Sequence, residues 1–187
     1  MQSVAKVSYG PTITEARGKA GDLLFQKSRG GNTVRALRVP TAEAGFGDGA
    51  RVYNSADLTI STGVETALTF NSERYDYGGL HDPASNPSRL TAKKAGVYII
   101  TASILWASAA AGARGLYLKL NGTTLLAQEF EMHATTGYCG QAIVTTFKLA
   151  VNDYVEVIVI ESGPATLKVL AVPQTSPEFA MQQVRSA

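Results

Sequence analysis

The stretch "DYVEVIVIES", residues 153–162, decides the fold that we expect. Val155, Val157 and Val159 alternate with other side chains, and a period of two is typical of a β-strand with these valines on one face. The opposite face is apolar apart from Glu156. The stretch therefore predicts a strand inside a layered β structure.

Further runs between Ala50 and the C-terminus have the same pattern, which is typical of β-strands. They are rich in Val, Ile, Thr, Tyr and Phe, many alternate with period two, and turn residues separate them. The Ala-rich segment 101–113 begins with β-branched residues and ends at Gly112, so we expect a strand that runs into a loop there. No segment has a convincing amphipathic helical pattern, and eight to ten short strands predict an antiparallel sandwich. The clearest runs are "DLTIST" (57–62), "VETALTF" (64–70), "VYIITASILWAS" (97–108), "GLYLKLNG" (115–122), "TTLLAQEF" (123–130), "CGQAIVTTFKL" (139–149) and "ATLKVLAV" (165–172).

The first 45 residues have a different composition. They contain seven basic and three acidic residues, a net charge of +4, whereas the rest of the chain carries −2. The junction "PTAEAGFGDGARVY" (40–53) is rich in glycine, which is typical of a hinge. We therefore expect an N-terminal arm over residues 1–45 and a globular head over residues 46–187.

Within the arm, "DLLFQKSRGGNTVRALRVP" (22–40) predicts a basic β-hairpin that turns at residues 30–32. On either side of the turn both faces mix apolar with cationic or polar side chains, which is more than a free surface hairpin needs. A two-stranded hairpin is marginal alone in water, so it is expected to lie against a partner. A merely solvated basic surface is the alternative.

The single cysteine, Cys139, excludes an intrachain disulfide and is expected to be a small buried residue rather than a catalytic thiol. No hydrophobic segment near the N-terminus resembles a signal peptide. The longest apolar run, residues 97–112, is too short to span a bilayer. We expect synthesis in a host cytoplasm and no membrane partner.

The chain has two histidines, and neither suggests catalysis or a metal site. His81 is next to Asp82 in a proline-rich loop, where a solvated turn with Asp82 bonded to backbone amides is expected. His133 follows Glu129 and Glu131 on one face of a strand, which is more often a wet face than a metal site when no cysteine or second histidine completes the ligand set. No phosphate-binding loop, GxSxG or CxxC motif occurs, so we expect no enzymatic activity and no cofactor.

Three segments resemble the globular head of complement-type collagens, a jelly roll of the tumour-necrosis-factor superfamily. They are "RLTAKKAGVYIITASI" (89–104) with a Gly-aliphatic-Tyr triplet, "LYLKLNGTTL" (116–125) with its Asn-Gly turn, and "FKLAVNDYVEVIV" (147–159). In the last segment Asn152 stands where the family prefers glycine, and asparagine still permits a left-handed turn. The resemblance covers roughly residues 50–183 and implies an all-β, antiparallel jelly-roll sandwich.

The same resemblance implies a homotrimer, because in such jelly rolls one sheet packs against two neighbours around a threefold axis. It also implies a calcium ion as an open alternative, with Glu73, Asp76 and Asp82 as the residues able to supply oxygen ligands. Large apolar side chains on the strands are then expected in the core or the trimer interface, namely Tyr98, Ile100, Trp106, Tyr117 and Phe147.

The arm segment "RGKAGDLLFQKSRGGNTVRALRVP" (17–40) is similar to the basic opening of small proteins encoded in phage genomes. Phage decoration proteins join such an arm to a trimeric head, so the resemblance implies a virion protein on the outer capsid surface, bound to the major capsid protein and stabilising the shell. A receptor- or glycan-binding head fibre is the alternative, and the arm's modest charge disfavours nucleic acid. The residues expected to contact the capsid are Phe25, Lys27, Arg29, Arg35, Leu37 and Arg38.

Overall fold

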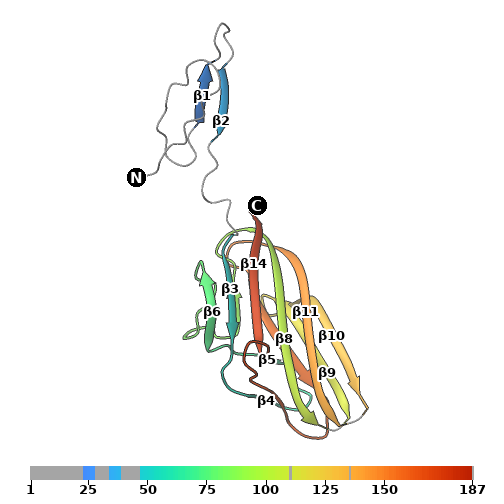
Figure 1. Ribbon diagram of the computed structural model, residues 1–187. Coiled ribbons are helices and arrows are strands. Elements are labelled where there is room, and N and C mark those ends of the chain that lie inside the picture. The colour runs from blue at the N-terminus through green and yellow to red at the C-terminus, as the bar shows by residue number, and fades with distance from the viewer. Residues whose placement is uncertain (1–22, 28–33, 39–46, 110, 135, 187) are drawn as a thin grey trace. The chain divides into compact units, whose positions relative to one another are not determined.

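The computed structural model describes residues 23–27, 34–38, 47–109, 111–134 and 136–186, and every regular element among them is a β-strand (Figure 1). The chain divides into two units, Met1–Gly45 and Phe46–Ala187. No helix in the described part of the chain has the length and apolar character needed to cross a bilayer.

The first unit contains the predicted hairpin. Strand β1 (Leu23–Lys27) pairs with β2 (Val34–Arg38) in antiparallel register, with Phe25 opposite Ala36. The expected turn at residues 30–32 and the candidate Arg29 lie outside the described residues.

The second unit, which we call the head, is a sandwich of two antiparallel sheets. The smaller sheet has five strands in the order β10-β9-β12-β5, and β7 also pairs with β12. The fold-deciding stretch forms β12, between β9 on one side and the short strands on the other. The strands of this sheet are β5 (Thr66–Ala67), β7 (Arg89–Thr91), β9 (Gly112–Leu120), β10 (Thr124–His133) and β12 (Tyr154–Glu161).

The larger sheet has seven strands in the order β4-β13-β8-β14-β3-β6, and β11 pairs with β8. The longest strand, β8, contains residues 101–109 of the Ala-rich segment and begins at the predicted Gly-Val-Tyr triplet (Figure 1). Gly112, where we expected a loop, begins β9 instead. The strands of this sheet are β3 (Gly49–Tyr53), β4 (Leu58–Ile60), β6 (Ser72–Tyr77), β8 (Gly96–Ala109), β11 (Gly137–Leu149), β13 (Leu167–Val169) and β14 (Glu178–Ser186).

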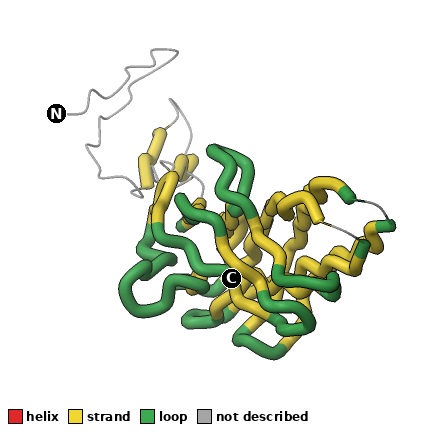
Figure 2. Tube along the Cα trace, turned by 90° about the horizontal axis from the view of Figure 1, so that it is seen from below, coloured by secondary structure: helices red, strands yellow, loops and turns green. Residues whose placement is uncertain are grey.

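The core lies between the two sheets. Val155, Val157 and Val159 of β12 have no exposed surface, as their alternation predicts. From the larger sheet, Tyr98 and Trp106 of β8 are also fully buried. Alternating apolar faces of both sheets thus meet in one core, and strands joined by loops account for the whole described head (Figure 2).

Two turns depend on left-handed backbone conformations. Asn121 and Gly122 have φ angles of 51° and 75° between β9 and β10, and Asn152 has 70° between β11 and β12. Asparagine tolerates this region better than other side-chain-bearing residues, so the predicted turn at Asn152 forms without glycine.

The sequence underestimated the number of strands, since the described head has twelve rather than eight to ten. Strand β14 was missed although it lies between β8 and β3 with Phe179 and Met181 buried. Its two central glutamines and its exposed C-terminal residues hide the alternation. Strand β6 was also missed, and it leads into the loop that contains His81 and Asp82.

Candidate functional site

The outer face of the larger sheet is a shallow apolar surface. Neighbouring residues of β8 and β11 expose large side chains there: Ile99 is 37% and Val144 is 66% exposed. A groove of about 540 Å³ crosses this face between β11, β8, β14 and β3, and it is lined by small and β-branched side chains such as Thr101 and Ala180. We call this region the outer face.

One border of the outer face carries a closed ionic network. Glu178 of β14 is 4% exposed, and its carboxylate accepts hydrogen bonds from Arg51 Nε at 2.7 Å and Arg74 Nη2 at 2.8 Å. The Arg74 guanidinium also lies 3.9 Å from the ring centroid of Tyr53. Every charge in this network has a partner, so the network serves the fold rather than a ligand.

A second group of polar side chains lies where the inner faces of the sandwich change from apolar to charged. Arg114 of β9 is opposite Glu131 of β10 on one side and opposite Glu161 of β12 on the other. His133 ends β10, and Cys139 of β11 approaches from the larger sheet. We call these five residues the polar cluster.

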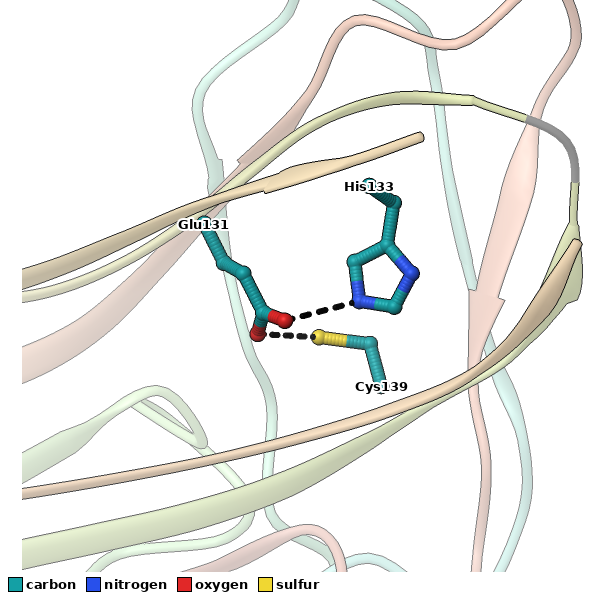
Figure 3. Close-up of side chains that lie close together, drawn as sticks. All are labelled: Glu131, His133 and Cys139. Atoms are coloured by element: carbon teal, nitrogen blue, oxygen red, sulfur yellow. Dashed lines mark hydrogen bonds and ion pairs between the residues drawn. The ribbon is translucent and has the colours of Figure 1, made fainter. Parts of the chain in front are cut away.

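Three members of the polar cluster turn their reactive atoms toward one another (Figure 3). Glu131 Oε2 lies 3.0 Å from Cys139 Sγ, and Glu131 Oε1 lies 3.1 Å from His133 Nε2. The three ligand atoms are all within 4.8 Å of one another. Glu131 thus bridges a thiol and an imidazole that belong to different sheets.

The polar cluster also contains the unsatisfied atoms of the head. Within the described residues, the buried side-chain nitrogen and oxygen atoms without a hydrogen bond are Arg114 Nη1, His133 Nε2 and Glu161 Oε1. The 3.1 Å approach of Glu131 to His133 is an ion-pair contact whose direction is poor for a hydrogen bond. Buried polar atoms without partners are rare in proteins, so these three distinguish the polar cluster from the rest of the described head.

The pKa of the Cys139 thiol is raised from 9.0 to about 12, mainly by burial and also by the neighbouring Glu131 carboxylate, while Arg114 acts in the opposite direction. The thiol is 2% exposed. It is therefore protonated at neutral pH and unreactive as a free nucleophile, as expected for a buried cysteine.

The prediction of a wet face at Glu129, Glu131 and His133 holds only in part. Glu131 is exposed, whereas Glu129 is half-buried and its Oε2 accepts a hydrogen bond from the Ala142 backbone N–H of β11. The other sheet supplies the cysteine that the sequence did not assign to this site. Cys139 is close to His133 in the sequence, but β10 and β11 belong to different sheets, so the contact depends on how the two sheets pack.

The structure separates the five predicted core or interface residues. Tyr98, Ile100 and Trp106 are fully buried within one chain, Tyr117 is half-buried, and Phe147 is 38% exposed. Trp106 Nε1 donates to Gln141 Oε1 at 2.7 Å, and Gln141 Nε2 donates to the Arg114 carbonyl oxygen. Trp106 is thus a core residue and not a ligand platform, and its hydrogen bond to Gln141 connects it to the backbone of Arg114 in the polar cluster.

The loop after β6 is organised differently from the expectation. Asp82 accepts hydrogen bonds from the backbone N–H groups of Ala84 and Ser85, as predicted, and these bonds lower its pKa. The His81 side chain, however, is buried and its Nδ1 lies 3.0 Å from Glu73 Oε1. The expectation that His81 is solvated was wrong, because the strand β6 brings Glu73 beside it.

The open calcium alternative gains no support from these contacts. Asp76 accepts hydrogen bonds from the backbone N–H groups of Leu80 and His81, and Asp82 also bonds to its own loop. Within the described residues the group of side chains arranged to hold a metal ion is Glu131, His133 and Cys139 instead.

Comparison with solved structures defines the class of fold. The chain is similar to the crystal structure of murine APRIL at pH 5.0, with a TM-score of 0.55 and 11% identity over 73% of this chain and 98% of that chain. It is also similar to the structure of Eiger TNF from S. frugiperda, with a TM-score of 0.51 and 12% identity over 76% of this chain and 94% of that chain. The head is therefore a tumour-necrosis-factor-like jelly roll, and the predicted fold class is confirmed.

The sequence itself does not place the chain more narrowly. No protein-family model matches it, and no curated protein is similar to it in sequence. At 11% and 12% identity the two solved structures share the fold with this chain, and the functional argument depends on its own surfaces.

Proposed function

We propose that the chain is a non-enzymatic binding protein that assembles as a homotrimer through its outer face. The hairpin β1–β2 attaches the trimer to another protein, which we propose is the major capsid protein of a phage. In this proposal the protein is a decoration protein on the outer capsid surface and stabilises the shell.

The observation that carries the proposal is the exposed apolar surface of the larger sheet. Val144 and Ile99 expose apolar surface on the outer face beside a groove of about 540 Å³, and the charged residues that line this groove, Arg51 and Glu178, are paired with each other at its border. Extended apolar patches on a protein surface mark interaction sites. A second copy of the same chain is the simplest occupant, because obligate homo-oligomer interfaces are apolar and large.

The hairpin supports the second part of the proposal. Its register sets Leu24 opposite Leu37 and Gln26 opposite Arg35, and opposite residues of an antiparallel pair share a face. Each face is therefore expected to combine apolar and polar or cationic residues, as a surface that docks on an acidic protein would. Three such arms on one trimer would bind together, so that moderate single contacts give a tight attachment.

A matched pair of valines tests the trimer. Val144 on the outer face is 66% exposed, and Val64 on a loop is 52% exposed. We expect Val144→Glu to convert the trimer to monomers in size-exclusion chromatography with light scattering, and Val64→Glu to leave it intact. A monomeric wild type, or a Val144→Glu protein that stays trimeric, would contradict the proposed interface.

Removal of the arm tests the attachment. A chain lacking residues 1–45 is expected to remain a folded trimer but to lose binding to capsid shells in co-sedimentation. In the full chain, Arg35→Glu with Arg38→Glu should weaken binding, whereas Lys93→Glu, in an exposed turn of the head away from the outer face, should not. Truncated protein that still decorates shells at wild-type occupancy would refute the role of the arm, and binding of the isolated head to glycans would favour a receptor-binding function.

A further inference from the structure

We propose that Glu131, His133 and Cys139 form a binding site for a zinc ion. The site lies between β10 of the smaller sheet and β11 of the larger sheet (Figure 3). The inference rests on the side chains of the head alone and is independent of the arm and of the trimer.

The geometry requires little rearrangement. Four-coordinate zinc has bonds of about 2.0 Å to nitrogen and oxygen and about 2.3 Å to sulfur, so its ligand atoms lie roughly 3.3–3.8 Å apart. The carboxylate oxygens of Glu131 are 3.0 Å from Cys139 Sγ and 3.1 Å from His133 Nε2, and all three ligand atoms are within 4.8 Å. Separations of this size need shifts of less than about 1 Å to surround one ion.

The donor set favours zinc over calcium or magnesium. A thiolate, an imidazole nitrogen and one carboxylate oxygen are the ligands typical of zinc sites, whereas calcium and magnesium prefer sets made of oxygen. Three protein ligands leave a fourth position open for water or for a group of a bound partner. The inference therefore concerns an open zinc site and not a closed structural one.

The charges around the site also favour a divalent cation. Glu131 and Glu161 are both opposite Arg114, so the guanidinium lies between two carboxylates of neighbouring strands. Glu161 and Arg114 are buried and the Glu131 side chain is 47% exposed, so one guanidinium faces two carboxylates, and a bound divalent cation would offset the unbalanced negative charge.

The unsatisfied atoms give independent support. His133 Nε2 is buried and receives no hydrogen bond, although Glu131 and Cys139 converge on it. A metal ion accepts this lone pair, and it also replaces the proton of the Cys139 thiol. Zinc would thus resolve the deficit at His133 and join the edge strands of the two sheets.

Cobalt(II) and zinc titrations of the full, tag-free chain test the inference. One equivalent of Co²⁺ is expected to produce a near-ultraviolet sulfur-to-cobalt charge-transfer band and visible bands of tetrahedral intensity, and Zn²⁺ should abolish both by displacement. Zn²⁺ should also raise the melting temperature. The tag must be absent because the chain has only two histidines of its own.

Variants separate this site from adventitious binding. Glu131→Gln and His133→Ala should weaken zinc binding by at least tenfold, and Cys139→Ala should remove the charge-transfer band. Glu129→Gln is the matched control and should bind as the wild type does, because its side chain still accepts from the Ala142 N–H. If Cys139→Ala does not fold, the zinc affinities of Glu131→Gln and His133→Ala decide whether the site exists. No band with the wild type, or equal binding by Glu131→Gln, would overturn the inference.

Discussion

Two of the buried carboxylates in the described head, Glu178 and Glu161, differ in how completely they are paired. Glu178, on the outer face of the larger sheet, accepts hydrogen bonds from Arg51 and Arg74. Glu161, at the polar cluster, accepts one from the Gly163 backbone N–H at 2.6 Å, and its other oxygen has no partner. Both residues are less than 5% exposed.

The difference teaches which buried charges stabilise this fold. A buried carboxylate contributes to stability when guanidinium groups replace the water that it lost, and it costs stability when one oxygen stays unpaired. The network of Glu178 is complete within one chain. The polar cluster is incomplete within one chain, which is why a ligand is proposed for the cluster and not for Glu178.

The largest expected effect is at the complete network. Glu178→Gln should lower the free energy of unfolding by about 2 kcal/mol, because two charge-assisted hydrogen bonds become weaker while Arg51 and Arg74 keep their charges. The value is moderated by the partial exposure of both arginines, whose side chains are 43% and 31% exposed. Urea denaturation at neutral pH measures it.

An exposed ion pair provides the control for that substitution. Glu65 is 51% exposed and pairs with Lys119, so Glu65→Gln makes the same chemical change in a solvated setting. We expect a loss of less than about 0.5 kcal/mol there. Equal losses at Glu65 and Glu178 would show that burial and double pairing do not matter at Glu178.

The second effect is smaller and appears only at alkaline pH. The pKa of Cys139 is raised by burial to about 12, so the folded state binds the thiol proton more tightly than the unfolded state with its value of 9.0. This contribution is complete below pH 9.0 and is lost as the pH rises toward 12. Denaturation across that range should show the stability falling, and less steeply in Cys139→Ala.

Other groups titrate in the same range and must be separated from Cys139. Burial raises the pKa of Tyr98 as well, so Tyr98→Phe is needed beside Cys139→Ala. Glu131 and Arg114 also face the thiol and act on its pKa in opposite directions. If Cys139→Ala and the wild type lose stability in parallel, the polar cluster does not hold the thiol in its protonated form.

The sequence predicted the layered fold more fully than the cluster. Alternation in β12 and the Asn-containing turns depend on local backbone preferences, and these are visible in a single segment. Strand β14 was missed because its central position is set by β8 and β3, while Gln182 and Gln183 interrupt its apolar pattern. The position of β14 is determined by the strands beside it, and its own sequence does not reveal them.

The polar cluster was predicted less completely than β14, for the same reason. The sequence predicted no metal site at Glu131 and His133, because no cysteine or second histidine completed the ligand set, and it assigned Cys139 only to the core. The contact forms because β10 and β11 end near each other in different sheets. A period of two identifies which residues share a face of a strand, but it does not identify which strand lies across the sandwich.

The smallest effect is expected at the incomplete cluster, and it tests the comparison most directly. Glu161→Gln keeps an oxygen that accepts from the Gly163 N–H, and it removes the charge from an oxygen that has no partner. The loss of attraction to Arg114 and the relief of burying an unpaired charge oppose each other. We therefore expect a change of less than about 1 kcal/mol in the free energy of unfolding without metal, in either direction. A loss as large as that of Glu178→Gln would mean that Glu161 is already satisfied by Arg114, and the two carboxylates would then be equivalent.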